Sequence, residues 1–118
     1  MMTEKDGGQL IVNERKRQIE DEGWTTEHDD HHEDFELTRA ARCYANHARF
    51  LGYPAPNVVL QDWPWGREWW KPEPRGVNAR MTKTESIRML VKAGALIAAE
   101  IDRLQRLPDA MPKEQEER

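Results

Sequence analysis

Tryptophans and basic residues alternate in one short window of the sequence, and this pattern suits nucleotide binding. The window contains Trp63, Trp65, Arg67, Trp69, Trp70 and Lys71. Indole rings stack on nucleobases with about 1–3 kcal/mol per base, and guanidinium and ammonium groups bind phosphate. We therefore predict that these residues, together with Arg88 further along the chain, bind a nucleotide-like ligand.

Two other interpretations of this tryptophan window stay open. Trp and Arg are enriched at the centres of protein–protein interfaces, so the partner could instead be a protein. The rings could also fill the core of a small protein whose helices are rich in alanine. We do not expect all of them to be structural, because one small core rarely needs several adjacent indoles.

Acids and histidines form a second candidate site at residues 27–36. This acidic segment holds six acidic residues, three histidines and no basic residue. Carboxylates and imidazoles are ligands for divalent metal ions. No metal is expected in our leading interpretation. The alternative is a magnesium site, and its ligands would be Asp30, Glu33, Glu36 and Glu100.

Two simpler interpretations of the acidic segment are also open. It could be the solvated start of a helix, where acids stabilise the positive end of the helix dipole. It could also form an ion pair, from Asp30 or Glu33 to Arg15, Arg17 or Arg88. Since Asp30 and Glu33 are one helical turn apart, we expect both to point towards the packed face of that helix.

Three other residues are of reactive types, but each has a structural interpretation. Cys43 lies among alanines and is typical of a small helix residue. Ser86 falls in the first turn of a predicted helix, and Glu100 flanks an apolar stripe close to Arg103 and Lys92. The sequence has no hydrolase, phosphate-binding or dinucleotide-binding motif. We therefore predict no catalytic residue and lean towards a protein that is not an enzyme.

The composition favours one small polar domain. The chain has 118 residues, of which 37% are hydrophobic and 34% charged, with a net charge of −4. No apolar run approaches the roughly 20 residues of a membrane span, and the N-terminus lacks a signal-peptide core. One cysteine forms neither an internal disulfide nor a cysteine-based zinc site. We expect a cytoplasmic protein that binds neither membranes nor bulk nucleic acid.

Helices and one long loop are expected to position these candidate residues. The expected segments are a leader at 1–8, helices at 9–22, from within 27–36 to about 48, and at 82–107, a loop at 50–80, and a charged tail at 108–118. Gly23 is a natural helix stop, and the loop is dense in proline. Val58-Val59-Leu60 could be a short strand. The expected fold is mainly α, a small three-helix domain over residues 9–107 with a long, ordered loop rich in Pro and Trp.

The third helix has the clearest signals. Thr82-Lys83-Thr84-Glu85 fits a capping box. An apolar stripe then follows at helical spacing, made of Ile87, Leu90, Val91, Gly94, Ile97, Ala98, Ile101 and Leu104. We expect burial of Leu90, Ile97 and Leu104 to contribute about 2 kcal/mol each. The breadth of this stripe also suggests a homodimer.

Several segments, in order, resemble a family of short proteins encoded by bacteriophages and prophages. They are Glu14-Arg15-Lys16-Arg17-Gln18, Glu22-Gly23-Trp24, Glu27-His28-Asp29-Asp30, Leu37, Ala40-Ala41, Tyr44-Ala45, Trp63-Pro64-Trp65, Trp70-Lys71-Pro72, Leu90-Val91-Lys92-Ala93-Gly94-Ala95-Leu96-Ile97 and Ala99-Glu100-Ile101. The likeness covers about residues 12–104. It implies a phage setting more than an activity.

A weaker likeness is to the MazG-like all-alpha nucleotide pyrophosphohydrolases, which hold magnesium with helical ExxE and ExxD motifs. Glu33-Asp34-Phe35-Glu36 is similar to the first motif. The second is absent, because in Glu100-Ile101-Asp102-Arg103 the aspartate comes one residue too early. This likeness implies the alternative function, a magnesium-dependent nucleotide pyrophosphohydrolase.

These observations lead to one expected function. We expect a phage- or prophage-encoded, non-enzymatic binding module in the cytosol of the host cell. It would engage a nucleotide-like ligand or a host protein through the tryptophan window, to counter host defence.

Overall fold

The computed structural model describes residues 5–54, 62–74 and 79–108 of the chain. The elements in these ranges are α1 (Gly7–Glu22), α2 (Thr26–Asp30), α3 (Glu36–His47), η1 (Ala48–Phe50), η2 (Arg67–Trp69) and α4 (Lys83–Gln105). The protein is mainly helical, and its described part contains no strand, which confirms the expected fold class. The described residues form four α-helices rather than the expected three.

The extra helix arises because the second expected helix is divided into α2 and α3. Thr25 caps α2, its hydroxyl accepting a hydrogen bond from the backbone N–H of His28 at 3.3 Å. Phe35, just before α3, adopts the left-handed conformation with φ of 59°, which interrupts a continuous helix. The prediction that Asp30 and Glu33 point inward on one helix is therefore wrong, and both residues are exposed.

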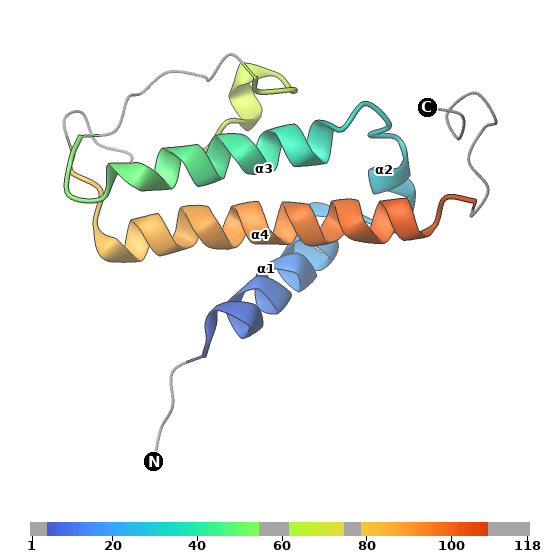
Figure 1. Ribbon diagram of the computed structural model, residues 1–118, viewed down its shortest axis with the longest axis horizontal. Helices are drawn as coiled ribbons and strands as arrows, with labels where there is room; N and C mark the ends of the chain where they lie inside the picture. The colour runs from blue at the N-terminus through green and yellow to red at the C-terminus, as the bar shows by residue number, and fades with distance from the viewer. Residues whose placement is uncertain (1–4, 55–61, 75–78, 109–118) are drawn as a thin grey trace, which may run out of the picture.

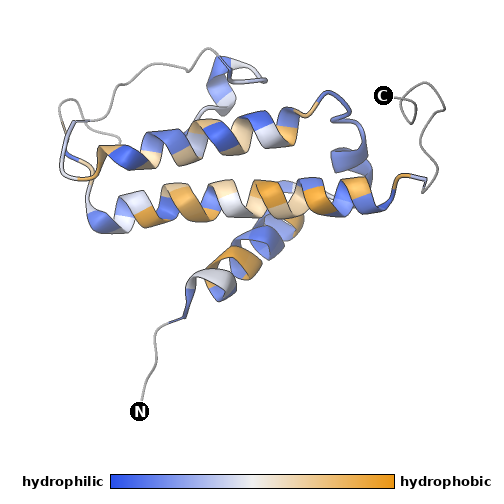
Figure 2. Cartoon of the chain, in the orientation of Figure 1, coloured by the Kyte–Doolittle hydropathy of each residue, from blue (hydrophilic) through white to orange (hydrophobic). Residues whose placement is uncertain are grey.

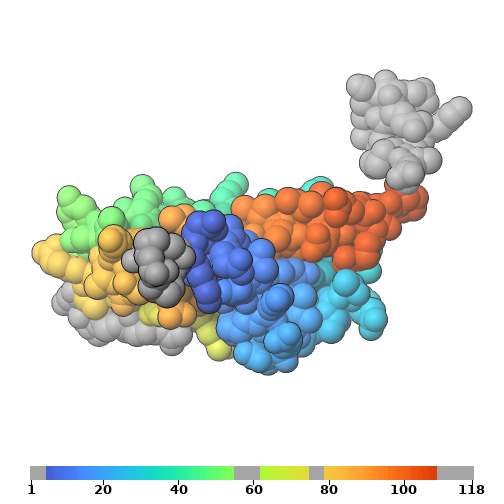
Figure 3. Space-filling model, turned by 90° about the horizontal axis from the view of Figure 1, so that it is seen from below, coloured from blue at the N-terminus to red at the C-terminus, as the bar shows by residue number. Residues whose placement is uncertain are grey.

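Helices α3 and α4 lie side by side and antiparallel, and α1 crosses the middle of α4 (Figure 1; Figure 3). The crossing is close because Gly94 has no side chain. A Cβ atom at Gly94 would lie 2.5 Å from Cδ1 of Ile11. The ends of α1 are also well defined: Asp6 caps its start, and Gly23, with φ of 74°, is the predicted stop.

The start of α4 confirms the predicted capping box. The Thr82 hydroxyl accepts from the backbone N–H of Glu85 at 3.1 Å, and the Glu85 carboxylate accepts from the backbone N–H of Thr82 at 2.9 Å. These bonds satisfy two donors that would otherwise lack helical partners. The helix ends at Gln105, slightly before the predicted end at residue 107.

Small side chains from α3 and α4 make up much of the core. The core residues are Leu37, Ala40, Ala41, Cys43, Tyr44, Ala48, Trp63, Trp70, Met81, Met89, Ala93, Leu96 and Ala99. The alanines let the helix backbones approach, and the indoles of Trp63 and Trp70 supply the missing volume. The interpretation of these rings as core residues is therefore correct for two of the tryptophans in the window.

The inward face of α4 is not the predicted one. Its buried apolar residues are Met89, Ala93, Ala95, Leu96 and Ala99. The residues expected to be buried are instead about half exposed, with values of 52% for Leu90, 48% for Ile97 and 42% for Leu104. Figure 2 shows hydrophobic residues recurring along the length of α4. The prediction fails within one chain because the alanine-rich α3 packs on the side of α4 where small residues allow close approach.

The start and the end of the long loop are tied to each other. Leu51 and Met81 form an isolated parallel bridge, and Pro54 and Arg80 an antiparallel one. The predicted strand at residues 58–60 lies outside the described residues, as does most of the tail. None of the described helices combines the length and the hydropathy that crossing a membrane requires.

Candidate functional site

A pocket of about 350 Å³ lies between α1, the tryptophan window and α4. This size is within the range of small-molecule sites, roughly 300–1,000 Å³. The chain segments that line it are far apart in the sequence, so the fold itself assembles the pocket. It has an aromatic wall, a wall from α1, and a basic edge.

Four indoles and one phenol ring form the aromatic wall. They are Trp24, Tyr44, Trp63, Trp65 and Trp69. Trp63 is fixed, because its Nε1 donates to the carbonyl of Gly66 at 3.1 Å and its ring meets that of Trp65 edge-on at 5.3 Å. Trp69, in η2, is 54% exposed. The wall thus combines a rigid base with one ring whose face is available for stacking.

Polar residues on one face of α1 form the opposite wall. Glu14, Gln18 and Glu22 follow one another at intervals of one helical turn. Arg17 bridges the two carboxylates, with its Nη2 2.8 Å from each. The hydrogen bond to Glu14, supported by Glu22, raises the pKa of Arg17 above its ordinary value. This arginine is therefore committed to its own helix rather than offered to an anion.

Lysines provide the basic edge of the pocket. Lys71 is exposed, and Lys92 projects from α4. The ammonium of Lys92 donates to the carbonyl of Lys71 at 3.2 Å and lies 5.3 Å from the centroid of the Tyr44 ring. These contacts place the Lys92 ammonium beside an aromatic surface, and Lys71 lines the same pocket. Cations beside an aromatic surface suit an aromatic anion.

Histidines from the acidic segment join the aromatic wall. His28 stacks on Trp24 with an interplanar angle of 2°, and His32 lies 5.2 Å from the ring of Trp65. Burial lowers the pKa of His32, and the nearby His28 lowers it further. The neutral imidazole is therefore favoured at His32, where it contributes an aromatic surface and a hydrogen-bonding nitrogen.

Several polar atoms of the pocket residues have no hydrogen-bond partner in the described part of the chain. They are Gln18 Oε1, His32 Nε2 and Trp65 Nε1. Unpaired buried polar atoms are rare because each costs about 1–3 kcal/mol. These atoms are covered in the present conformation, so a ligand reaches them only if the surrounding rings turn. Together they offer an acceptor, an indole donor and an imidazole nitrogen.

The structure brings together only part of the predicted ligand-binding set. Trp63, Trp65, Trp69 and Lys71 line the pocket. Trp70 instead packs in the core, 5.0 Å from Tyr44 between ring centroids. Two predicted basic residues do not line this pocket: Arg67 is exposed on η2, and Arg88 lies 3.8 Å from the Glu73 carboxylate.

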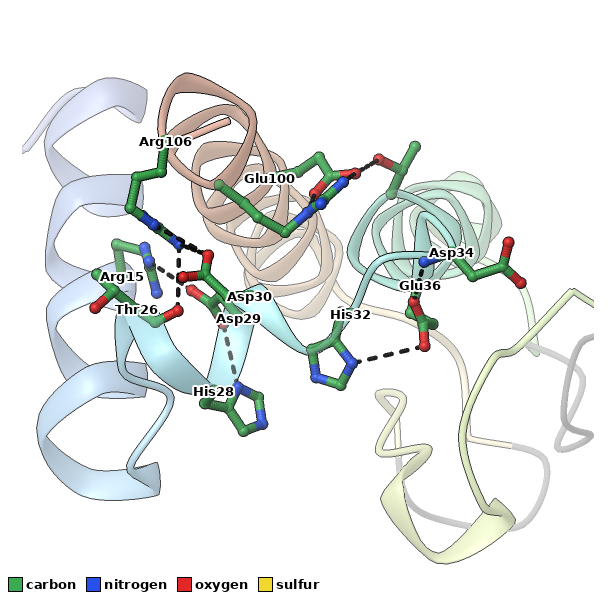
Figure 4. A network of polar contacts seen from close by, with 12 residues as sticks. Arg15, Thr26, His28, Asp29, Asp30, His32, Asp34, Glu36, Glu100 and Arg106 are labelled. Carbon is green, nitrogen blue, oxygen red and sulfur yellow. Dashed lines mark hydrogen bonds and ion pairs between the residues drawn. The ribbon is translucent and has the colours of Figure 1, made fainter. Parts of the chain in front are cut away.

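The acidic segment mainly joins helices to one another (Figure 4). Asp29, with no exposed surface, accepts from Arg15 of α1 at 2.8 Å and lies 3.2 Å from Nδ1 of His28. Asp30 accepts from Arg106, just beyond α4, at 2.6 Å. An ion pair was one of the predicted roles, but its partners differ: Asp29 takes Arg15, and Asp30 takes Arg106.

Three of the four carboxylates named as alternative magnesium ligands have separate partners, and the fourth is exposed. Asp30 holds Arg106, Glu33 is exposed, and Glu100 accepts from Arg103 at 2.7 Å. Glu36 accepts from the backbone N–H of Asp34 at 2.8 Å. Within residues 5–54, 62–74 and 79–108, no group of three or more His, Cys, Asp or Glu residues is arranged to hold a metal ion.

The remaining reactive residue types have structural roles. Burial raises the pKa of the Cys43 thiol, which disfavours the nucleophilic thiolate. Ser86 is buried and donates to the carbonyl of Ala48 at 2.9 Å, linking α4 to η1. Glu100 accepts hydrogen bonds from its neighbour Arg103, as the structural interpretation of this carboxylate expected.

Sequence reasoning missed the contribution of α1 and of the histidines to the pocket. The signal in α1 was the interval of four between Glu14, Gln18 and Glu22, which puts them on one face. The signal for His28 was the aromatic Trp24 at the same interval. Neither interval identifies the opposite wall, because only the tertiary fold brings α1 to the tryptophan window.

Comparison with known proteins adds no relative: no protein-family model, no curated protein and no solved structure matches this chain.

Proposed function

We propose that the protein is a non-enzymatic module that binds a nucleotide-like ligand, a planar heterocycle carrying an anionic group, in this pocket. The observation that carries the proposal is that one pocket is lined by the aromatic wall, which includes the exposed Trp69 ring, and by two lysines, Lys71 and Lys92. A heterocycle would stack on the wall, and its phosphate would lie at Lys71 and Lys92. The α1 wall would then meet the polar edge of the heterocycle.

The pocket chemistry favours such a ligand over a simple anion or an apolar molecule. A simple anion would leave the aromatic wall unused and would face the carboxylates of Glu14 and Glu22. An apolar molecule would leave Gln18, His32 and Trp65 without partners. A nucleotide supplies a stacking surface, hydrogen-bonding edges and negative charge together.

The setting of this function rests on the likeness to phage proteins. In the cytosol of an infected cell, a protein that sequesters a nucleotide signal would blunt a defence that depends on it. The engagement of a host protein through the same window is the competing proposal. Hydrolysis with magnesium is a weaker one, because the described carboxylates are not gathered around a common point.

Calorimetric titration with a panel of nucleotides and cyclic nucleotides, with and without magnesium, tests the proposal. Each mixture is then checked for product. We expect at least one nucleotide to bind without turnover. Product that forms only with magnesium would replace the binding module with a hydrolase. No binding by any nucleotide, from a protein shown to be folded, would reject the proposal and favour the host protein.

Substitutions in the tryptophan window test whether the nucleotide binds in this pocket. Lys71→Glu should weaken binding roughly 10-fold or more, since a charged hydrogen bond contributes about 1.5–3 kcal/mol. Trp69→Ala should weaken it about 5- to 150-fold through lost stacking. Arg67→Glu is the matched control, because it makes the same charge change outside the pocket. Equal loss from Arg67→Glu and Lys71→Glu would indicate general attraction of anions and contradict the assigned site.

A further inference from the structure

A line of large aliphatic side chains on α4 is left without a partner in the single chain. Its members are Ile87, Leu90, Ile97, Ile101 and Leu104, which we call the α4 outer face. Each is between 42% and 52% exposed. Their spacing alternates between intervals of three and four once Gly94 is included, which is the heptad pattern of helices that pack along a partner helix.

The α4 outer face carries the hallmarks of an interface centre. At 100° per residue, its side chains share one side of the helix, and no charged residue from Ile87 to Leu104 falls on that side. Depletion of charge distinguishes the centres of interfaces from the rest of a protein surface. The neighbouring α1 adds Val12 and Ile19, which are 48% and 38% exposed. These two lie on the flank of α1 that faces away from Glu14 and the pocket.

The apolar area is close to what a dimer needs. At about 30 Å² per methylene-sized group, a half-exposed Leu or Ile side chain leaves roughly 60 Å² of apolar surface. The α4 outer face with Val12 and Ile19 therefore leaves on the order of 400 Å² per chain. A standard interface buries about 800 Å² per partner, of which a little more than half is apolar.

The order of the residues favours a second copy in the antiparallel direction. The face is symmetric about the point between Ala95 and Leu96. Three pairs of positions lie at equal distances on either side of this point: Ile87 and Leu104, Leu90 and Ile101, and Gly94 and Ile97. A two-fold axis at that point would place Ile87 opposite Leu104 of the second copy and Leu90 opposite Ile101. Ile97 would lie level with Gly94 of the second copy, a position without a side chain against which that copy's own Ile11 packs. Such a self-complementary patch is what an isologous dimer requires.

We propose that the protein forms a symmetric homodimer in which the α4 outer faces of two copies pack antiparallel. The pocket lies on a different side of α4, since Lys92 and Leu96 are more than a quarter-turn away from the centre of this face. The proposal therefore does not depend on the proposed ligand.

Sedimentation equilibrium over a range of protein concentrations tests the dimer. We expect a dimer for the natural sequence and a monomer for Ile97→Glu, with unchanged helical circular dichroism. Leu90→Glu is a second variant, should the first fail to fold. Tyr53→Glu, at a residue that is 66% exposed and off the face, is the matched control and should stay dimeric. A natural protein that is monomeric at every concentration, or a dimer that survives both glutamates, would overturn the proposal.

Cysteine crosslinking tests the direction. In the proposed arrangement the two copies of residue 97 are offset by only about 5 Å along the helix axis, and those of residue 104 by about 25 Å. Ile97→Cys should therefore oxidise to a covalent dimer, whereas Leu104→Cys should not. The native Cys43 is buried and serves as the background in both variants. Efficient crosslinking through Leu104→Cys would indicate a parallel pair and refute the antiparallel one.

Discussion

At the scale of single residues, adjacent aspartates have different consequences for stability. Asp29 has no exposed surface and pairs with Arg15, whereas the Asp30 side chain is 51% exposed in its pair with Arg106. Removing one partner of a buried ion pair leaves the other charge uncompensated, at a cost of about 3–5 kcal/mol. An exposed pair contributes only about 0–1 kcal/mol.

We predict that Asp29→Ala lowers the free energy of unfolding by about 3 kcal/mol. Arg15 bears the loss, because its Nε and Nη1 atoms already have no partner in the described part of the chain. Urea denaturation measures the change, and Asp30→Ala is the matched control, expected to cost less than about 1 kcal/mol. Similar losses for both variants would show that Arg15 does not depend on Asp29.

Two histidines, the buried His47 and the half-buried His32, should make the stability of the fold sensitive to mild acid. Burial lowers the pKa of His32 and of His47 from the ordinary 6.5. As the pH falls below about 6.5, these side chains take up protons first in the unfolded chain. Unfolding is then accompanied by proton uptake, so the free energy of unfolding falls until the pH passes the lowered pKa values of the two histidines in the folded protein.

The prediction is a lower urea midpoint at about pH 5.5 than at about pH 7.5. His47→Gln should reduce this difference, because the glutamine amide does not titrate in this pH range. The amide can still donate to the Glu73 carbonyl that His47 Nε2 reaches at 3.0 Å. His31→Gln, at an exposed position, is the control and should keep the difference. A larger difference in His47→Gln than in the natural protein would reverse the assigned sign.

At the scale of elements, the start of α4 is determined locally. The capping box depends only on neighbouring residues, which is why the sequence was sufficient to predict it. We expect Thr82→Ala to lower the free energy of unfolding by about 1 kcal/mol. Thr84→Ala, at an exposed position inside α4, is the control and should be neutral or slightly stabilising because alanine favours helices. The midpoints of thermal unfolding of the two variants are compared, and an equal shift of both midpoints would show that Thr82 does not stabilise α4 as a cap.

The inward face of α4 was not predictable in the same way. Two lines of residues on this helix are able to pack, a line of large aliphatic residues and a line of smaller ones. Size favours burial of the large aliphatic residues, but the alanines of α3 select the smaller line. If the proposed dimer forms, both lines are buried, and the expectation for Leu90 and Ile97 holds for the assembly rather than for one chain.

At the scale of the whole molecule, the sequence predicted one wall of the pocket and not the others. The tryptophan window was conspicuous in composition, so Trp65, Trp69 and Lys71, which line the pocket, were singled out from the residues alone. The division of roles within it was not, because Trp63 and Trp70 differ from Trp69 only in what the fold packs against them. The α1 wall depends on the crossing at Gly94, a long-range contact without a local signal.

The placement of the two proposed surfaces on separate sides of α4 leads to a final prediction. Ile97→Glu should separate the copies and leave nucleotide affinity within about twofold, because well-separated sites without shared partners act nearly independently. Trp69→Ala should weaken the ligand and leave the dimer intact. Calorimetry and sedimentation on both variants complete the cycle. Loss of nucleotide affinity in a folded Ile97→Glu monomer would instead mean that the pocket needs the second copy, through the α1 helix that lies between the pocket and the α4 outer face.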